Sequence, residues 1–406
     1  MESQRLALSR TYNAIAMALA LVATFGLVAS AEAADKPAKG PGGSKFYTPP
    51  SDYPNKHGKV IWQRKAGGLS PIDGARSNTL LLYVSKTPAG DKTATSGVVS
   101  VPEGKAPKKG WPVITYAHGT TGAADPCAPS RVTASSLVAP YVEYIDPELE
   151  DWIDAGYAVV QTDYQGLGTP GPHEYLIRQA EGRAVIDLVL AARRLNSDIG
   201  SKYLIAGHSQ GGHAALSAAG LAQKYGNGIK LRGTVAFAPA SQIAEQVDLL
   251  PSLTAPSGLS ALAALILEGA SSFDPAVDEN ALLNPEPLAL FPQVQETCLP
   301  QLVEPDSFGG IAPSKLINEY ADTGPLLNVL SAQNPAVKTT APIFIAQGTA
   351  DTTVFPFLTN ELANQLVAKG NDVDYQEYPG VTHGEIPSAA EPQTLEFFEQ
   401  RLPAGN

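Results

Sequence analysis

The sequence predicts an α/β fold with helices on both faces of a mostly parallel central sheet and a helical segment inserted into it. The first observation is a repeated alternation of short apolar runs, typical of buried strands, with segments whose apolar residues recur at helical spacing. The second is a stretch at 241–340 in which the alternation stops. Because alternating strands and helices form parallel sheets covered on both faces, the pattern favours this architecture.

Composition is consistent with a large globular core. The chain has 406 residues, of which 44% are hydrophobic and 17% charged, as in ordinary soluble domains. The formal net charge of −12 argues against binding to nucleic acid or to an anionic membrane surface.

The N-terminal residues 1–33 are typical of a signal peptide. Arg5 and Arg10 precede an apolar stretch at 14–28, and small residues suited to cleavage follow; an uncleaved anchor is the alternative. Residues rich in Pro, Gly and Lys at 34–50 predict a flexible lead-in. We therefore expect a secreted or periplasmic protein without a stable membrane span after cleavage.

The core is expected at 51–240 and 341–406. Its first part begins with β-rich runs that favour an antiparallel start to the sheet, at 60–64, 79–85 and 95–101. Buried strands then follow at 111–116, 157–163, 203–206 and 233–237, and helices at 147–155, 175–195 and 214–224. Asp146 is the expected N-cap of the first helix.

The stretch at 241–340 is expected to form a helical cap, or lid, because a structureless loop of that length is implausible inside a domain. It contains helical pieces at 259–267 and 313–320, broken by prolines. The core then resumes with strands at 341–347 and 374–378 and helices at 358–368 and 390–402.

A G-x-S-x-G motif at 207–211 lies between a predicted strand and a predicted helix. A sharp turn from strand to helix strains its central residue, and glycines on either side remove side chains that would clash there. The serine hydroxyl is then held above the sheet at a helix N-terminus. The motif therefore predicts Ser209 as a nucleophile, against the alternative of a glycine-rich turn capped by serine.

A serine nucleophile needs a base to remove its proton, and histidine is the usual one. Of the six histidines, His383 follows the last predicted strand, in a glycine-flanked turn from which a side chain can reach back. His208 and His213 flank Ser209, but the backbone geometry is expected to point their side chains elsewhere. His383 is therefore the predicted base, and a surface histidine in a turn is the alternative.

The carboxylate that orients the base is expected at the carboxyl end of a strand. Asp351 lies there, after the strand at 341–347, whereas Asp372 and Asp374 lie at the start of a strand. Asp163 ends an earlier strand and suits a structural role. The resulting chain order of serine, acid and histidine is that of the α/β-hydrolase fold.

The oxyanion formed during acyl transfer needs two N–H donors. The backbone N–H of Gln210, directly after the nucleophile, is one expected donor. The second is expected from the loop after the strand at 111–116, where Thr120 is the first choice and Gly119 the next. An ordinary strand-ending turn is the alternative for this loop.

The two cysteines, Cys127 and Cys298, allow one intramolecular pairing. In an oxidising compartment a disulfide is the natural reading. It would contribute about 4–5 kcal/mol at most in the chain-entropy model. Two unrelated buried thiols are the alternative.

Several motifs together make the chain resemble the secretory lipase family. They are G-H-S-Q-G-G at 207–212, D-Y-Q-G-L-G-T-P-G at 163–171, G-T-A-D at 348–351 and C-A-P-S at 127–130. The resemblance extends from about residue 53 to the C-terminus. It implies an α/β-hydrolase whose cap covers an acyl-binding tunnel. It also implies serine-dependent hydrolysis of carboxylic esters, triacylglycerols included.

The family's catalytic triad is matched by Ser209, Asp351 and His383. At the second oxyanion donor the chain departs from the family, since yeast members have an acidic residue where this chain has H-G-T-T at 118–121.

The expected function is that of an exported serine carboxylic-ester hydrolase, a lipase acting on acylglycerols or medium-chain esters through an acyl-enzyme on Ser209. A short-chain carboxylesterase, an acyltransferase or a peptidase could use the same triad, and an inactive hydrolase fold used for binding is the alternative from another class. No cofactor is expected, and no metal motif is visible, since His383-Gly384-Glu385 lacks ligand spacing. The expected partner is a small-molecule or lipid ester, with transient contact to a lipid interface and none to nucleic acid.

Overall fold

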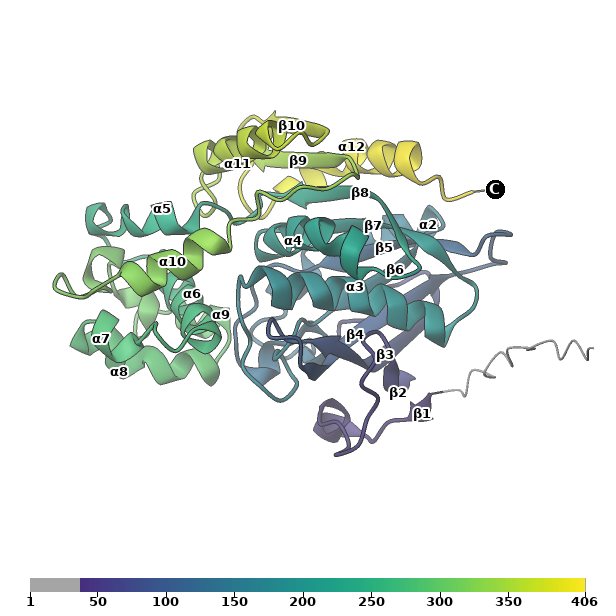
Figure 1. The fold of residues 1–406 in the computed structure, drawn as a ribbon, viewed down its shortest axis with the longest axis horizontal. Helices are drawn as coiled ribbons and strands as arrows, with labels where there is room; N and C mark the ends of the chain where they lie inside the picture. Colours follow the sequence, from purple (N-terminus) through teal and green to yellow (C-terminus); the bar gives the residue numbers. More distant parts are fainter. Residues whose placement is uncertain (1–36, 406) are drawn as a thin grey trace, which may run out of the picture. The chain divides into compact units, whose positions relative to one another are not determined.

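The computed structural model describes residues 37–405, so the expected signal peptide at 1–33 lies outside the described residues. Within this range ten strands form one sheet in the order β1-β2-β3-β4-β6-β5-β7-β8-β9-β10 (Figure 1). In this order, every neighbouring pair from β6 through β5, β7, β8 and β9 to β10 is parallel. The pairs β2–β3, β3–β4 and β4–β6 are antiparallel, as the sequence predicted for the start of the sheet. The strands are β1 (Ala38–Lys39), β2 (Val60–Lys65), β3 (Ala75–Lys86), β4 (Lys92–Pro102), β5 (Trp111–Ala117), β6 (Ala158–Thr162), β7 (Ile199–His208), β8 (Lys230–Phe237), β9 (Ile343–Gly348) and β10 (Val373–Tyr378).

Helices cover both faces of this sheet. Successive residues of a strand point to opposite sides, so Val113 and Ile205 pack in one core with α3 and α4, while Ile114 and Leu204 pack in another with α2 and α12. The fold is therefore the α/β arrangement that the sequence predicted. The helices outside the insertion are α1 (Pro140–Glu143), α2 (Asp146–Asp154), α3 (Arg178–Leu195), α4 (Gln210–Tyr225), α11 (Pro356–Ala368) and α12 (Ile386–Arg401).

A helical insertion separates β8 from β9 in the sequence. Its helices gather in one group at one end of the sheet (Figure 1) and share an apolar core with the segment that precedes α3. None of the helices among residues 37–405 is both long and apolar enough to cross a membrane. The helices of the insertion are α5 (Ile243–Val247), α6 (Leu259–Phe273), α7 (Glu279–Leu282), α8 (Pro285–Leu290), α9 (Leu299–Leu302) and α10 (Gly324–Ala332).

Three local expectations differ from the structure. The helix expected at 313–320 is only a 3-10 turn, Pro313–Lys315, because the backbone at Ile317 instead pairs with Leu283 in a β-bridge. Asp146 is the first residue of α2 rather than its cap, and no side chain caps that helix. The helix expected from residue 175 begins at Arg178, because Leu176 has a positive φ of 57°.

The lead-in expected to be flexible at 34–50 is packed against the core where the structure describes it. Strand β1 pairs with β2, and the Phe46 side chain is fully buried. The Tyr47 hydroxyl donates to the carbonyl oxygen of Ser130 (2.9 Å), and Trp62 Nε1 donates to that of Phe46 (2.8 Å). Burial of two aromatic rings thus outweighs a local composition typical of linkers.

A disulfide joins the loop after β5 to the insertion. Cys127 and Cys298 are bonded, as predicted from the cysteine count. Beside the bond, Gly122 pairs with Cys298 in a β-bridge, and the backbone N–H of Leu299 donates to the carbonyl oxygen of Thr121 (2.9 Å). The insertion is therefore fastened to this loop by one covalent bond and by backbone pairing.

Removal of the disulfide is expected to lower stability without abolishing the fold. The bond spans a sequence separation of 171 residues, and loss of such a bond costs about 2–5 kcal/mol. The variant Cys127→Ala/Cys298→Ala, unfolded in denaturant beside the oxidised native protein, measures this difference. Equal unfolding free energies, or two free thiols in the native protein by non-reducing peptide mapping, would contradict the assignment.

A buried carboxyl group on α12 makes stability depend on pH. Glu391 is 8% exposed, and its Oε1 accepts a hydrogen bond from Trp152 Nε1 (2.9 Å). Burial raises the pKa of Glu391 to about 8 and is the largest influence. The hydrogen bond from Trp152 lowers the pKa, and the nearby carboxylates of Glu148 and Asp151 raise it further. The folded protein therefore holds this proton where the unfolded chain has lost it, and stability falls as pH rises from about 4.5 to 8.

The substitution Glu391→Gln is expected to remove this loss, because the amide oxygen can still accept from Trp152. Thermal unfolding from pH 4.5 to 9 should show the variant gaining stability over the native protein up to about pH 8, with a constant difference above it. Glu396→Gln, at an exposed position of the same helix, is the matched control and should show no such gain. A pH-independent difference for Glu391→Gln would refute the explanation.

Candidate active site

The predicted nucleophile lies at a strained turn between β7 and α4. Ser209 has φ 59° and ψ −118°, a conformation that L-residues rarely adopt. Its backbone N–H donates to the carbonyl oxygen of Phe237 (2.9 Å), and its own carbonyl oxygen accepts from Ala240 N (3.1 Å). A Cβ atom at Gly207 would collide with the backbone of Gly211. The motif glycines therefore allow the close approach that the turn requires.

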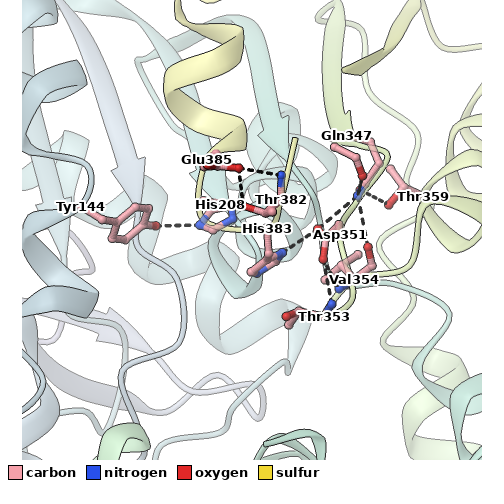
Figure 2. A network of polar contacts seen from close by, with 11 residues as sticks. Tyr144, His208, Gln347, Asp351, Thr353, Val354, Thr359, Thr382, His383 and Glu385 are labelled. Carbon is pink, nitrogen blue, oxygen red and sulfur yellow. Dashed lines mark hydrogen bonds and ion pairs between the residues drawn. The ribbon is translucent and has the colours of Figure 1, made fainter. Parts of the chain in front are cut away.

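The predicted base and acid are in direct contact. His383 Nδ1 lies 2.7 Å from Asp351 Oδ2 (Figure 2). The other carboxylate oxygen accepts from the backbone N–H groups of Thr353 (2.8 Å) and Val354 (2.9 Å). Gln347 Nε2 donates to Oδ2 (3.2 Å). These bonds fix the carboxylate, so that it can accept a hydrogen bond from His383 Nδ1–H, which leaves Nε2 as the unprotonated, basic nitrogen.

The turn that carries the base is held by its own side chains. The Glu385 carboxylate accepts from Thr382 N (3.0 Å) and Thr382 Oγ1 (2.6 Å), as the dashed lines near His383 in Figure 2 mark. The rival carboxylate Asp374 is exposed on β10 and accepts from Gln376 Nε2 (3.1 Å). Asp351 is therefore the carboxylate that contacts His383 in this structure.

The loop after β5 lies against the same cavity as the nucleophile and base. Gly119, Thr120, Ser209 and His383 all line it. Thr120 Oγ1 is 2.6 Å from the Tyr175 hydroxyl, which restrains the loop. Gln210, the first residue of α4, does not line the cavity through its side chain, whose Nε2 instead donates to Glu181 Oε1 (2.9 Å). Its predicted contribution rests on the backbone N–H alone.

The loop also contains a histidine that cannot easily take a proton. His118 Nδ1 donates to the carbonyl oxygen of Gly119 (2.7 Å). Burial lowers the pKa of His118 to about 4, so the ring is neutral at ordinary pH. The Tyr164 hydroxyl donates to the His118 carbonyl oxygen (2.8 Å), which holds the loop from the other side.

His208 belongs to the site, contrary to the expectation that its side chain points elsewhere. The two rings lie side by side (Figure 2), with the ring centroid of His208 4.5 Å from that of His383, and both residues line the cavity. The Tyr144 hydroxyl lies 2.8 Å from His208 Nδ1 and 3.0 Å from the Tyr116 hydroxyl. Burial, followed by the charge on His383, holds the pKa of His208 well below its ordinary value. A neutral ring beside the base adds no repulsion when His383 becomes protonated.

Sequence reasoning missed Tyr144 and Tyr175 because nothing in the local pattern marks them. Tyr144 follows the short helix α1, and Tyr175 precedes α3. Both are identified only by the residues that they contact. The position of His208 next to the nucleophile was a signal, but the direction of its side chain depends on the partner Tyr144.

Asp163 has a structural role, as its position predicted. Its side chain accepts from Ser96 Oγ (2.5 Å), from the backbone N–H of Ser130 (2.9 Å) and from Ser130 Oγ. These bonds join the end of β6 to the segment after Cys127. Within the described residues 37–405, no group of three His, Cys, Asp or Glu side chains is placed to hold a metal ion.

The cavity itself is large and mostly apolar. Its volume is about 810 Å³, within the range typical of ligand pockets. Its polar lining includes Ser209 and His383, and the insertion supplies most of the apolar side chains. Among these are Ile243, Leu259, Leu262, Ile266, Leu316 and Leu330.

The comparisons with known proteins agree with this geometry. The sequence model of the secretory lipase family matches residues 142–405. No curated protein sequence matches the chain.

Solved structures with the same fold include Candida antarctica lipase A in its closed state, 22% identical over 88% of this chain and 85% of that one, with a TM-score of 0.73. They also include the rice cell wall degrading esterase LipA from Xanthomonas oryzae, 16% identical over 86% and 98%, with a TM-score of 0.66. A putative hydrolase from Legionella pneumophila is 20% identical over 80% and 90%, with a TM-score of 0.65. The fold is that of the α/β-hydrolases, and because the family model spans more than half of the sequence, the chain belongs to the secretory lipase family and is a carboxylic ester hydrolase.

Proposed function

We propose that the protein hydrolyses acylglycerols or medium-chain esters through an acyl-enzyme on Ser209. The observation that carries the proposal is the convergence of three features on one cavity. These are a serine at a strained strand-to-helix turn, a histidine bonded to a buried aspartate, and an apolar wall supplied by the insertion. Each feature alone can be explained by a purely structural role, whereas their combination is typical of an enzyme that catalyses acyl transfer.

In the proposed reaction His383 Nε2 takes the Ser209 hydroxyl proton as Oγ attacks the ester carbonyl carbon. The negative charge that forms on the carbonyl oxygen is stabilised by the backbone N–H of Gln210 and by that of Thr120 or Gly119. The bond to the alcohol breaks, and the leaving oxygen takes the proton from His383. Water then repeats the sequence on the acyl-enzyme, which releases the carboxylic acid and regenerates Ser209.

The substrate class is inferred from the cavity wall. A cavity of about 810 Å³ lined by aliphatic side chains favours a hydrophobic acyl chain over a short or polar one. We propose that the segment at 241–340 acts as a cap that excludes water from the bound acyl group. Tyr141 and Leu249 line the cavity and are 38% and 37% exposed, which suits transient contact with a lipid interface.

The disulfide and the membership of a secretory family fit an extracytoplasmic protein. We propose that residues 1–33 direct export as a signal peptide. The mature enzyme would then act on small-molecule or lipid esters in a secreted or periplasmic form.

Asp351→Asn is expected to lower kcat for ester hydrolysis by about four orders of magnitude, because the amide misorients the His383 ring. Asp374→Asn exchanges an exposed carboxylate that does not contact the base and is the matched control, with kcat expected at the native value. Steady-state kinetics on a p-nitrophenyl ester compare the two. A severe loss in Asp374→Asn and none in Asp351→Asn would overturn the assignment of the acid.

The acyl cavity predicts that kcat/KM rises from acetyl to medium-chain p-nitrophenyl esters. Each added methylene that becomes buried contributes up to about 0.8 kcal/mol, or roughly a fourfold gain per carbon, until the cavity is full. Ser209→Ala, which should lose several orders of magnitude in turnover while folding normally, establishes that the measured activity belongs to this site. A profile that peaks at acetate and falls steadily would instead indicate a short-chain esterase.

A further inference from the structure

A second acid–histidine pair is buried beside the residue that follows Ser209. Glu181 Oε2 on α3 lies 2.7 Å from His213 Nδ1 on α4, and both side chains are 1% exposed. Glu181 Oε1 accepts two further hydrogen bonds, from Gln210 Nε2 (2.9 Å) and from the backbone N–H of Leu176 (3.0 Å). None of these groups takes part in the proton transfers of the proposed reaction.

The pair is also connected to the insertion. His213 Nε2 lies 2.9 Å from the carbonyl oxygen of Gln333, which follows α10. Because a carbonyl oxygen only accepts, His213 Nε2 carries a proton. A second proton lies in the contact between His213 Nδ1 and Glu181 Oε2. The side-chain oxygen of Gln333 accepts from the backbone N–H of Arg178 (3.0 Å), at the start of α3.

Two routes lead from Glu181 to the two expected oxyanion donors. The first is the bond to the side chain of Gln210, whose backbone N–H is one donor. The second passes through Leu176, held in a left-handed conformation with φ 57°, to the adjacent Tyr175, whose hydroxyl is 2.6 Å from Thr120 Oγ1. A single carboxylate therefore restrains both sides of the site.

We propose that Glu181 is a positioning residue for ester hydrolysis, which acts with His213 to hold the two oxyanion donors in place. This role rests on the proposed function of Ser209. Oxyanion donors need accurate placement, since an error of about 1 Å can cost a hundredfold in rate. A carboxylate that only stabilised the fold would affect unfolding and leave kcat of the folded enzyme unchanged.

The same helix provides a matched control. Asp187 on α3 is also buried, lies 2.5 Å from His57 Nδ1, and accepts from the Ser85 hydroxyl (2.8 Å) and the Tyr225 hydroxyl (2.8 Å). None of these residues lines the cavity. Asp187→Ala therefore breaks a comparable acid–histidine pair, with a buried acid and a partly buried histidine, without touching the site.

The experiment compares Glu181→Ala, Glu181→Gln and Asp187→Ala by steady-state kinetics on the best p-nitrophenyl ester and by thermal unfolding. Glu181→Ala is expected to lower kcat by about 10- to 100-fold with KM changed by less than about threefold, because the loss falls on the transition state. Glu181→Gln should recover most of this kcat, since its oxygen can accept from Gln210 and Leu176 and its NH₂ can donate to His213 Nδ1. Asp187→Ala should lower the melting temperature and keep the native kcat.

The proposal is overturned if Glu181→Ala keeps the native kcat, if Glu181→Gln is as slow as Glu181→Ala, or if Asp187→Ala loses as much kcat. If Glu181→Ala does not fold, Gln210→Ala breaks the same tether from its other end and leaves the Glu181–His213 pair intact. A kcat reduced about tenfold then supports the proposal, and a native kcat overturns it. Ser209→Ala distinguishes failure of the proposed function from failure of the positioning role. If ester hydrolysis survives in Ser209→Ala, the proposed function is refuted. If Ser209→Ala is inactive while Glu181→Ala keeps the native kcat, only the positioning role is refuted.

Discussion

The contact of three backbone segments around Ser209 is the constraint on which the rest of the site depends. A side chain at Gly211 would collide with the carbonyl group of Ala117, and one at Gly207 would collide with Gly211. The end of β5, the end of β7 and the start of α4 therefore lie in direct backbone contact. Because β5 leads into the loop with Gly119 and β7 leads into Ser209, a single packing arrangement places that loop relative to Ser209. The fully buried residues on both faces of these strands keep that arrangement rigid.

Much of this organisation could be predicted because it depends on local pattern and on chain order. Five consecutive residues at 207–211 are sufficient to predict the strand-to-helix turn. Asp351 and His383 are 32 residues apart, yet each follows a strand of a parallel sheet, and the carboxyl ends of such strands meet at one edge. The disulfide followed from there being only two cysteines. In each case the number of physically reasonable partners was small.

Two of the failures have the opposite character, since a distant contact decided each of the two. Local composition predicted a flexible lead-in, but Phe46 is buried against the sheet and Tyr47 is bonded to Ser130. The position of His208 beside the nucleophile suggested a side chain turned away, but the Tyr144 hydroxyl holds its ring against His383. The spacing of apolar residues in the sequence does not indicate such contacts, because the partners come from other elements of the fold.

The disulfide also divides the three proposed catalytic residues by covalent topology. The bond between Cys127 and Cys298 closes a ring of chain that includes Ser209, while Asp351 and His383 lie in the linear segment beyond it. A backbone cut inside the ring leaves every part of the molecule covalently joined. A cut between α9 and β9 instead separates the part of the chain with Ser209 from the part with Asp351 and His383, which is then retained by packing alone. One cut in the stretch at 303–342 would therefore leave Ser209 on one polypeptide and Asp351 and His383 on the other.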